Sequence, residues 1–453
     1  MRIKTEIPLS LGFIKDSLGL KSTACEHTTY VSAICTDTRK VIGEELFIGL
    51  RGEDLDGSVF IPDIKDRALF TIGALSSDAD IKVENTGTSL LRLANAYKKL
   101  LPIKSTVAIT GSVGKSTTKN LLTLIMKSKF QLHSTYKNLN NEIGVPFTVF
   151  SAPKNTELLI CESGMNHRGE LERISRCIEP DVSVITKIGS AHIGNLGTRE
   201  KIAEAKLEIL SGMKEKFAII PFDEELLSSK MENYKTVSTK NSSADYFLQK
   251  RSDDNFVLKH PNGKIDIRLS EISAAGFHVS ECLGFALATA IECGMNTTEI
   301  KKAVEDIDFG IFSNTVAVKD LKIINDSYNA SPEATEEALK SLSKLYTKKS
   351  ALLGDMLELG DFSEELHYKI GLCASKSGID KLYLIGAFSD SVLHGAVAGG
   401  FDKNRIFINE DAQQPEITAE QILTHSKDEV ILFKASRKIR LERIIDILKK
   451  AEK

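Results

Sequence analysis

The sequence predicts an α/β fold made of three domains, and three observations lead to this prediction. The chain has 453 residues, which corresponds to about three domains at roughly 150 residues each. Short apolar, β-branched segments alternate with amphipathic ones, a pattern typical of mostly parallel sheets covered by helices. Pro102 follows a helical stretch at 88–100 and marks the end of the first domain. We therefore expect domains at 1–103, 104–310 and 311–453.

The first domain has the pattern of a small α/β unit, and the central domain shows the alternation most clearly. Central strands are expected at 107–110, 158–161, 182–185 and 217–220, and helices at 116–128, 169–178 and 199–213. A turn signal at 261–263 predicts short antiparallel strands within 244–269, and 280–306 predicts helix. The central domain should therefore hold a mostly parallel sheet that also includes short antiparallel strands.

A third α/β unit begins near residue 315. Its expected strands are 322–325, 350–353, 382–385, 405–408 and 430–433. Helices are expected between them, and a charged amphipathic helix at 438–450 closes the chain. Regular alternation again indicates a parallel sheet with helices on both faces.

Composition excludes several classes of function. The net charge of −3 argues against a nucleic-acid-binding protein, which usually carries a basic excess. No apolar segment approaches the ~20 residues that cross a bilayer, and charged residues occur too early for a signal peptide. The seven cysteines form no Cys-x-x-Cys pair, which favours free thiols in a reducing compartment. We expect a cytoplasmic monomer with no nucleic-acid partner and no membrane insertion.

The strongest motif lies between an expected strand and an expected helix. It reads Ala108-Ile109-Thr110-Gly111-Ser112-Val113-Gly114-Lys115-Ser116-Thr117-Thr118. Glycines let backbone N–H groups approach phosphate oxygens, and a helix N-terminus adds partial positive charge. Lys115 would reach the β- and γ-phosphates of ATP, and the Ser116 hydroxyl would bind Mg²⁺. Because Ile109 stands where the common pattern has glycine, this is a shorter form of the phosphate-binding loop.

Two further strand ends in the central domain carry polar side chains. Glu162 follows the strand at 158–161, near the expected nucleotide crevice, and is a candidate Mg²⁺ ligand. His192 follows the strand at 182–185, and only that position distinguishes it from an ordinary packed histidine. Lys206 lies on a helix face, where a lysine is normally solvated, so its position alone predicts no function.

Two polar segments of the third domain also follow strands. In the first, Ser331 is expected to cap a helix that begins at Pro332, and the preceding run at 326–329 could face a ligand. In the second, Asp355 and Glu358 could orient a substrate amine, or could be ordinary polar loop residues. Capping explains the serine and proline without a ligand, whereas it does not explain the polar run.

In order and spacing, these motifs resemble those of the Mur ligases of peptidoglycan synthesis over nearly the whole chain. The matching segments are 36–39, 46–57, 110–119, 138–146, 162–166, 189–208, 326–332 and 354–360. The resemblance implies an N-terminal domain for a uridine nucleotide, a central ATPase domain and a C-terminal Rossmann-like domain. It also implies that ATP phosphorylates the carboxylate of a UDP-linked muramoyl peptide, after which an amine attacks the acyl phosphate.

The resemblance further implies roles for individual residues. ATP would be bound by Gly111, Ser112, Val113, Gly114, Lys115, Ser116, Thr117, Asn140, Asn141, Asp326 and Asn329. Mg²⁺ would be bound by Ser116, Glu162, His192 and Lys206, the last in carbamylated form. Lys115, Lys206, His192 and Glu162 would be catalytic. Substrates would be bound by Thr38, Arg39, Asp355 and Glu358, and the segment 354–360 indicates a D-alanyl-D-alanine acceptor.

The chain departs from the family pattern at several positions. Val279 and Lys187 replace asparagines, Gly194 replaces an acid, Ser58 replaces a histidine, and an arginine is missing from 310–318. These changes motivate two alternatives. One is a diverged Mur-type ligase with another amine acceptor or carboxylate donor. The other is a nucleotide-binding partner without turnover, against which the intact metal-ligand set argues.

Overall fold

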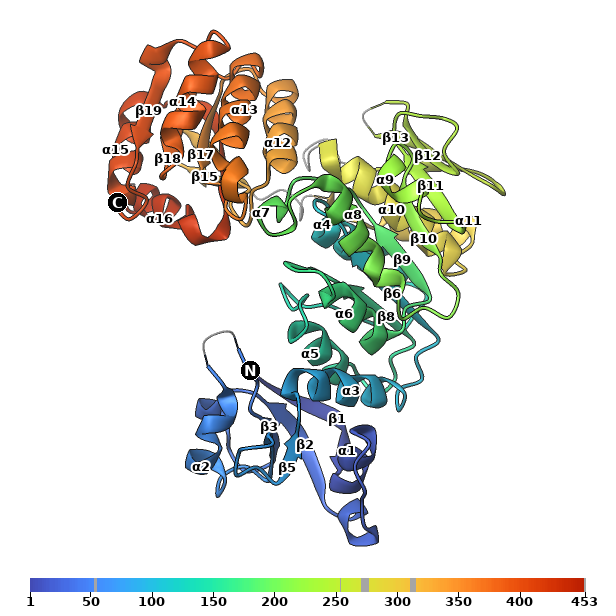
Figure 1. The fold of residues 1–453 in the computed structure, drawn as a ribbon. Helices are drawn as coiled ribbons and strands as arrows, with labels where there is room; N and C mark the ends of the chain where they lie inside the picture. Colours follow the sequence, from blue (N-terminus) through green and yellow to red (C-terminus); the bar gives the residue numbers. More distant parts are fainter. Residues whose placement is uncertain (53–54, 253, 270–276, 310–314, 452–453) are drawn as a thin grey trace.

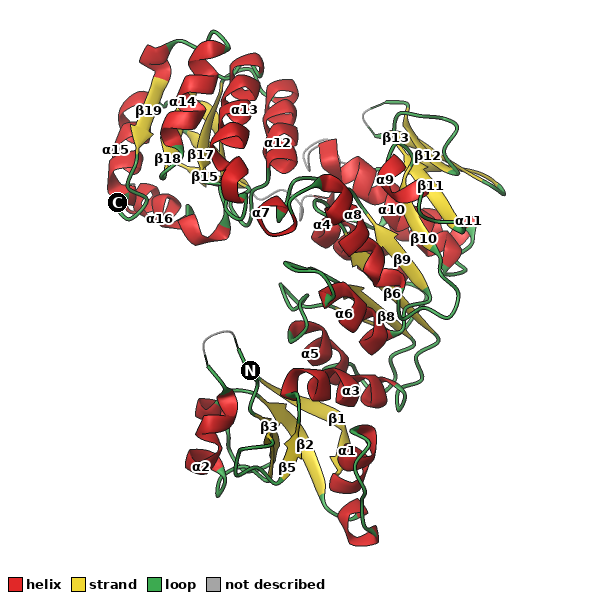
Figure 2. Ribbon diagram, in the orientation of Figure 1, coloured by secondary structure: helices red, strands yellow, loops and turns green. Residues whose placement is uncertain are grey.

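The chain folds around three separate sheets, which a computed structural model describes for residues 1–453 except 53–54, 253, 270–276, 310–314 and 452–453. Each sheet is formed by its own stretch of the chain (Figure 1). Helices cover the sheets throughout (Figure 2). The predicted α/β class with three domains is confirmed. We refer to the parts built on these sheets as the N-terminal, central and C-terminal domains.

The N-terminal sheet has the order β1-β2-β3-β4-β5. Its strands are β1 (Arg2–Ser10), β2 (Tyr30–Cys35), β3 (Glu45–Ile48), β4 (Phe70–Ala74) and β5 (Ile81–Val83), and its helices are α1 (Leu11–Ser17), α2 (Ile61–Ile64) and α3 (Thr86–Lys98). Only β1 is antiparallel to its neighbour. The Asn85 side chain caps α3 by accepting from the Thr88 amide, which fixes where this helix begins.

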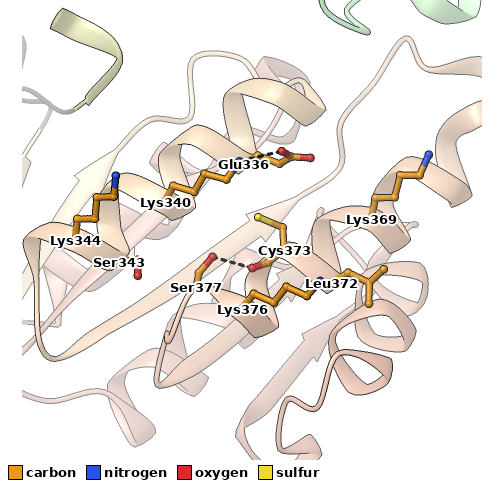
Figure 3. Close-up of a pocket in the computed structure, with 9 residues that line it drawn as sticks. All are labelled: Glu336, Lys340, Ser343, Lys344, Lys369, Leu372, Cys373, Lys376 and Ser377. Carbon is orange, nitrogen blue, oxygen red and sulfur yellow. Dashed lines mark hydrogen bonds and ion pairs between the residues drawn. The ribbon is translucent and has the colours of Figure 1, made fainter. Parts of the chain in front are cut away.

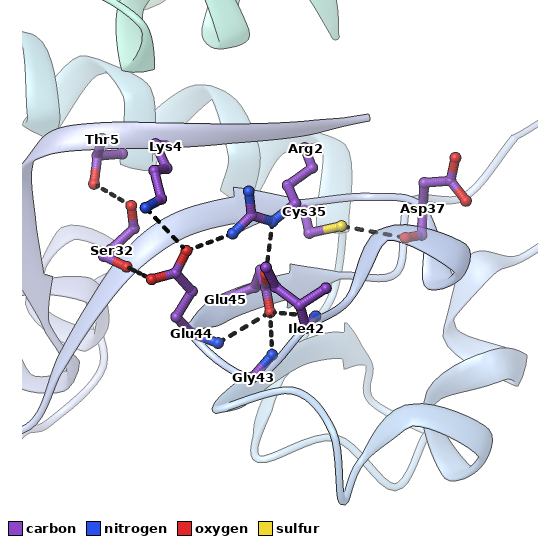
Figure 4. Close-up of polar contacts among 10 residues, drawn as sticks. All are labelled: Arg2, Lys4, Thr5, Ser32, Cys35, Asp37, Ile42, Gly43, Glu44 and Glu45. Atoms are coloured by element: carbon purple, nitrogen blue, oxygen red, sulfur yellow. Dashed lines mark hydrogen bonds and ion pairs between the residues drawn. The ribbon is translucent and has the colours of Figure 1, made fainter.

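A buried carboxylate holds the loop that precedes β3 (Figure 4). One oxygen of Glu45 accepts hydrogen bonds from the backbone amides of Ile42, Gly43 and Glu44, at 2.9–3.1 Å. The other oxygen accepts from Arg2 at 2.6 Å. Burial alone would raise the pKa of Glu45, but Arg2 and the amides outweigh burial and lower it. The charged carboxylate therefore ties β1 to the loop before β3.

Helix α3 joins the first two domains through a shared core. In Figure 1 it lies between the N-terminal sheet and helices α5 (Gly144–Phe150) and α6 (Glu170–Ile178). A single hydrophobic cluster includes buried residues from all of these elements. The rings of Tyr97 and Phe150 pack with centroids 5.5 Å apart, and Asn95 donates to the Cys177 carbonyl at 2.9 Å. The N-terminal and central domains therefore pack as one body.

The central sheet has the order β14-β13-β12-β11-β10-β9-β6-β8-β7. Its strands are β6 (Ser105–Thr110), β7 (Leu132–Ser134), β8 (Leu158–Glu162), β9 (Val182–Ile185), β10 (Ala218–Pro221), β11 (Tyr234–Ser238), β12 (Tyr246–Lys250), β13 (Asn255–His260) and β14 (Gly263–Arg268). Strands β6 to β12 are parallel to their neighbours, and β13 and β14 are antiparallel. Because β6 lies between β9 and β8, the loops after these three strands meet at one edge.

The helices of the central domain agree with the prediction except near its end. They are α4 (Lys115–Met126), α5, α6, α7 (Ile193–Leu196), α8 (Arg199–Leu207), α9 (Glu225–Ser228), α10 (Phe277–Glu292) and α11 (Thr297–Glu305). The helix predicted over 280–306 is present as two helices, α10 and α11, because the chain breaks at Gly294, where φ is +87°. Asn296 and Glu299 then form a capping box that starts α11.

The C-terminal sheet has the order β15-β16-β20-β17-β18-β19. Its strands are β15 (Thr315–Val318), β16 (Leu321–Asn325), β17 (Lys349–Gly354), β18 (Lys381–Ile385), β19 (Ile406–Asn409) and β20 (Glu429–Lys434), and its helices are α12 (Pro332–Leu345), α13 (Ser363–Lys376), α14 (Ser389–Ala398), α15 (Pro415–His425) and α16 (Glu442–Lys450). The five predicted strands are confirmed. The sequence prediction missed β15, an antiparallel edge strand.

Two further expectations concern the whole chain. All seven cysteines are free thiols, as the scattered spacing predicted. Within the described parts of the chain, no helix has both the length and the apolar character that crossing a bilayer would require.

Candidate active site

The phosphate-binding motif forms a tight loop between β6 and α4. Gly111 and Gly114 have φ values of +142° and +92°, which glycine adopts without strain. A Cβ on Gly111 would lie 2.0 Å from Thr186 Oγ1 and 3.0 Å from its backbone nitrogen, so no side chain fits there. Lys115 Nζ donates to the Gly111 carbonyl at 2.7 Å. Lys115 therefore lies at the start of α4, beside the loop, as the motif predicts.

The loop after β9 braces the phosphate-binding loop from the side. The Ser112 amide donates to the Lys187 carbonyl at 2.8 Å, and the Gly189 amide donates to the Ser112 hydroxyl at 2.9 Å. Thr186 Oγ1 donates to the Val113 carbonyl at 2.6 Å. Two of the predicted ATP-binding positions, Ser112 and Val113, are thus also held by this neighbouring loop. Ser116 is exposed and Thr117 is half-buried at the first turn of α4.

Glu162, at the end of β8, presents one carboxylate oxygen without a partner. Its side chain is 2% exposed, and Oε1 accepts from Asn140 Nδ2 at 2.8 Å. Oε2 is buried and has no hydrogen-bond partner among the residues that the structure describes. A buried anionic oxygen without a partner costs several kcal/mol unless a cation or donor meets it. This oxygen therefore fits the Mg²⁺ ligand predicted at this strand end.

Asn141 has a different environment from Asn140. Its Oδ1 accepts from the backbone amides of Ile143 and Gly144, at 3.2 and 2.8 Å. The side chain therefore holds the start of α5, whereas Asn140 supports the Glu162 carboxylate. Of the predicted asparagine pair, the structure brings only Asn140 into contact with another predicted site residue.

Lys206, on α8, is buried instead of solvated. Its exposed fraction is 1%, so the solvated side chain expected from the helix position is wrong. Among the described residues, no acceptor or acidic group pairs with its amine. Burial, followed by the charge of Lys115, lowers the pKa of Lys206 well below its usual value. The neutral, nucleophilic form of the amine is therefore favoured more than it is in a solvated lysine.

His192 contacts the C-terminal domain instead of Glu162. Its backbone is left-handed, with φ at +65°, and its Nδ1 lies 2.7 Å from Glu358 Oε2. His192 is the main cause that lowers the pKa of Glu358. Among the described residues, no three His, Cys, Asp or Glu side chains gather to hold a metal. In the part of the chain that the structure describes, His192 therefore pairs with the predicted substrate residue Glu358 and forms no ion pair or hydrogen bond with Glu162.

The loops after β16 and β20 meet at the edge of the C-terminal sheet. Lys434, 3% exposed, forms a 2.9 Å ion pair with Asp326 and donates to the Asn329 carbonyl at 2.7 Å. Burial and then the charge of Glu162 raise the pKa of Tyr328, so this loop faces the central site. The sequence prediction missed Lys434, although a polar run after the expected strand 430–433 marked it.

The two acids predicted at the end of β17 have different surroundings. Asp355 is buried, and its oxygens accept from the Ala387 and Phe388 amides at 3.0 Å. A Cβ on Gly386 would lie 2.5 Å from this carboxylate. Asp355 therefore builds the turn before α14, which is the ordinary polar-loop role, and its contact with a substrate stays a prediction. Glu358 alone of this pair faces the central domain.

The predicted nucleotide-binding residues of the N-terminal domain lie on its surface. Arg39 is 86% exposed in its side chain and pairs with Asp37 at 2.9 Å. This pairing lowers the pKa of Asp37 to about 2. Thr38 begins a short 3₁₀ turn that the Asp37 side chain caps. The guanidinium is open to solvent and to an anionic ligand.

The departures from the family pattern have structural explanations where the structure describes them. Val279 is fully buried in the core of the central domain. Ser58 Oγ donates to the Gly49 carbonyl and accepts from the Ala74 amide. Lys187 and Gly194 both contact the C-terminal domain. Of the segment that lacks the arginine, residues 310–314 lie outside the described residues.

A cavity of about 440 Å³ lies away from these strand ends. It is a groove between α12 and α13, as Figure 3 shows. Its lining residues are Glu336, Lys340, Ser343, Lys344, Lys369, Leu372, Cys373, Lys376 and Ser377. Lysines near helix C-termini complement the partial negative charge of the last turns. This groove needs no ligand to explain its charge.

Comparison with known proteins agrees with these features. The Mur ligase middle domain matches residues 109–290, and the Mur ligase, glutamate ligase domain, matches residues 313–437. UDP-N-acetylmuramoyl-tripeptide–D-alanyl-D-alanine ligase of Bacillus subtilis (strain 168) is 34% identical over 436 residues, covering 92% of this chain and 93% of that protein.

Solved structures show the same architecture. A crystal structure of MurF from Acinetobacter baumannii has a TM-score of 0.85 and 26% identity, covering 99% of this chain and 100% of that one. MurF ligase from Thermotoga maritima in complex with ADP has a TM-score of 0.77 and 26% identity, covering 92% and 97%. Because the identity to the Bacillus protein spans nearly all of both chains, the resemblance read from the motifs is confirmed, and the chain belongs to the Mur ligase family.

Proposed function

We propose that this chain is an ATP-dependent amide ligase that adds D-alanyl-D-alanine to a UDP-N-acetylmuramoyl tripeptide in peptidoglycan synthesis. The observation that carries the proposal is the buried, unpartnered Glu162 oxygen at the edge of the central sheet that also bears the phosphate-binding loop. The named substrates follow from relatives that match nearly the full length of the chain.

The proposed reaction has two balanced steps. A carboxylate oxygen of the tripeptide attacks the γ-phosphorus of ATP, and ADP leaves. The amine of the dipeptide then attacks the acyl carbon, phosphate leaves, and the amine loses a proton. Because phosphoryl transfer needs mainly positioning and charge neutralisation, the loop amides and Lys115 would hold the phosphates in line. Lys115 would exchange its contact with the Gly111 carbonyl for the β- and γ-phosphates.

The buried Glu162 oxygen without a partner fits a Mg²⁺ ligand. Ser116, Glu162, His192 and carbamylated Lys206 would hold the ion, which when bound neutralises phosphate charge. Asn140 orients the Glu162 carboxylate by donating to its other oxygen. A neutral Lys206 amine can add to CO₂ with loss of one proton, and its burial without an acceptor favours that neutral form. Carbamylation converts this neutral amine into an anionic ligand.

The remaining domains would bind the two other reactants. Arg39 and Thr38 would contact the uridine nucleotide, and the loops after β16, β17 and β20 would contact ATP and the acceptor amine. Asp326 and Asn329, which Lys434 orders, would supply the nucleotide contacts. We also propose that the protein acts as a monomer in the cytoplasm, where ATP is available and its free thiols stay reduced.

The test is phosphate release from ATP and Mg²⁺, with UDP-N-acetylmuramoyl tripeptide and D-alanyl-D-alanine, beside a Lys115→Ala control. We expect release only when both substrates are present, with a product heavier by the dipeptide. The control should lose roughly 100-fold or more in rate, the usual effect of removing a charge-stabilising group.

Other outcomes would replace the proposal. Turnover with a different amine or carboxylate, in a panel of acceptors and donors, would identify a diverged Mur-type ligase. ATP binding without release under any condition would identify a nucleotide-binding partner. Substitution of the third residue of the donor peptide in the same assay would define donor specificity.

A further inference from the structure

Helix α12 of the C-terminal domain touches the loop after β9 through two acids one turn apart. Glu333 Oε1 accepts from both the amide and the hydroxyl of Ser190, each at 2.7 Å. Glu337 forms an ion pair with Lys187. Since residues i and i+4 lie on one face of a helix, these two contacts form a single strip. That strip joins the domains directly beside the phosphate-binding loop.

The strip is closely packed. A space of only about 20 Å³ is lined by Gly114, Lys187, Glu281, Glu337 and their neighbours. A Cβ on Gly189 would lie 2.7 Å from Glu333 Oε2, so the carboxylate sits directly over the glycine. Burial alone would lower the pKa of Lys187, but Glu337 outweighs burial and raises it. The lysine is therefore charged, and the ion pair is partly shielded from water.

We propose that Glu333 and Glu337, through Ser190 and Lys187, are the pivot that positions the C-terminal domain over the ATP site for the second step. This inference rests on the proposed function, because it assigns the acceptor-binding loops to the moving domain. Glu333 and Glu337 act as positioning residues. They hold the start of α12, and hence the 326–331 loop, at a fixed distance from the phosphate-binding loop.

A second contact between the domains differs from the pivot in one respect. His192 pairs with Glu358, and the Gly194 amide donates to the Glu358 carbonyl at 3.2 Å. Glu358 holds only Nδ1 of His192, which leaves Nε2 as the nitrogen that could meet a metal. The strip on α12 uses no proposed metal ligand, so it can persist while the second contact opens. Rotation about the strip would therefore swing the loop after β17 relative to His192.

Lys187 makes the pivot a specific feature of this chain. It replaces an asparagine of the family pattern, and its cation meets Glu337 directly. Glu281, on α10, also lies near Lys187 and favours its charged form. If Glu337 were only neutralised, Lys187 could still interact with Glu281. Replacing Glu337 by a lysine places two positive charges together and therefore perturbs the contact more strongly.

The test is a charge exchange read out by distance and by kinetics. Dyes placed at exposed Glu215 and Lys403 through unnatural amino acids report the separation of the two domains by single-molecule fluorescence transfer. For Glu337→Lys we expect a broadened distance distribution and a kcat about 10-fold lower. The exchange Lys187→Glu with Glu337→Lys should narrow the distribution and restore kcat to within about 3-fold. The matched control is Glu336→Lys, on the same helix but facing the groove of Figure 3.

Two outcomes would contradict the proposal. An unchanged distance distribution in Glu337→Lys, with a normal melting temperature, would overturn the pivot. A loss that the exchanged pair does not rescue would also overturn it, since the effect would not depend on this ion pair. The distance readout needs no turnover, so it stands if the acceptor or donor of the proposed function proves different.

Discussion

At the scale of single residues, Lys206 combines a functional role with a cost in stability. Its amine is buried without an acceptor among the described residues, and its pKa lies well below 10.5. The unfolded chain therefore binds more protons than the folded one between those pKa values, and stability rises with pH across that range. In CO₂-free buffer we expect Lys206→Met to raise the free energy of unfolding at pH 7 by on the order of 1 kcal/mol.

The gain in Lys206→Met should shrink as the pH approaches 10.5, the ordinary pKa of lysine. Thermal melts across pH, followed beside phosphate release, would measure both effects. We expect the variant to be more stable and inactive. With ¹³C-bicarbonate, a carbamate resonance should appear in the wild type and not in the variant. A variant that is less stable at neutral pH would show that Lys206 is not the unpaired neutral group described above.

Glu162 should affect turnover without affecting folding. Gln in its place can still accept from Asn140 but offers no anionic oxygen to a cation. We expect Glu162→Gln to lower phosphate release by about 100-fold or more, with no lower melting temperature. Glu172→Gln is the matched control, because Glu172 is half-buried on α6 and its side chain, among the described residues, forms an ion pair with Arg176 away from the strand ends. Equal losses in both variants would contradict the role assigned to Glu162.

At the scale of elements, the Glu45 carboxylate fixes the loop before β3. Folding lowers its pKa below the usual 4.5. Its stabilisation is therefore complete above pH 4.5 and is lost as the pH falls through the folded value. In Glu45→Gln we expect the Ile42, Gly43 and Glu44 amides to exchange hydrogen about 10-fold faster at pH 7, since a charged acceptor is worth roughly 1.5–3 kcal/mol. Unchanged exchange would show that other contacts hold the loop.

Most helices and strands could be predicted because the spacing of apolar residues that identifies them is a local property of the sequence. The strands that end at Thr110, Glu162 and Ile185 follow from short apolar segments. The break at Gly294 was also readable, because Asn296 and Glu299 have capping-box spacing. The edge strand β15 was not, since only its antiparallel partner β16 gives it a pattern. Strand ends therefore predicted the candidate residues, whereas their partners depend on contacts between domains.

At the scale of the whole molecule, the partners of predicted residues are set across the interface. No local pattern joins His192 to Glu358, or Lys187 to Glu337, because their separations exceed 140 residues. The same holds for Lys206, whose burial depends on the packing of α8 against the rest of the central domain. Sequence alone therefore identified the chemistry of the site more fully than its arrangement.

Closure of the C-terminal domain is the prediction that belongs to this scale. Since His192 of the central domain pairs with Glu358 of the C-terminal domain beside the ATP site, binding of reactants should rearrange the interface. We expect the radius of gyration from small-angle scattering to fall on adding a nonhydrolysable ATP analogue, Mg²⁺ and the UDP-linked tripeptide. An unchanged radius with saturated ligands would argue against closure.

Gly194→Ala tests the second interdomain contact by steric means. A Cβ there would lie 2.6 Å from the Gly360 nitrogen and 2.9 Å from the Glu358 carbonyl oxygen. Because these are backbone atoms, we expect the loop after β17 to move away and the His192–Glu358 pair to weaken. Hydrogen exchange of the backbone amide at position 194 should accelerate by several-fold, while the exchange rates of the α4 amides stay constant. Ala substitution at exposed Gly400, where nothing lies within 4 Å but φ is +92°, controls for backbone strain.

The shared core around α3 has a consequence for how the protein is made. Tyr97 lies on α3, which ends at Lys98, but the helices that cover this region extend to Ile178, about 80 residues later. At ~5–20 residues per second, the ribosome needs roughly 4–16 s to supply that cover. During this interval the nascent N-terminal domain exposes apolar side chains that have no partner yet. A chain that ends shortly after residue 100 would therefore require a chaperone, although every strand of the N-terminal sheet has been synthesised.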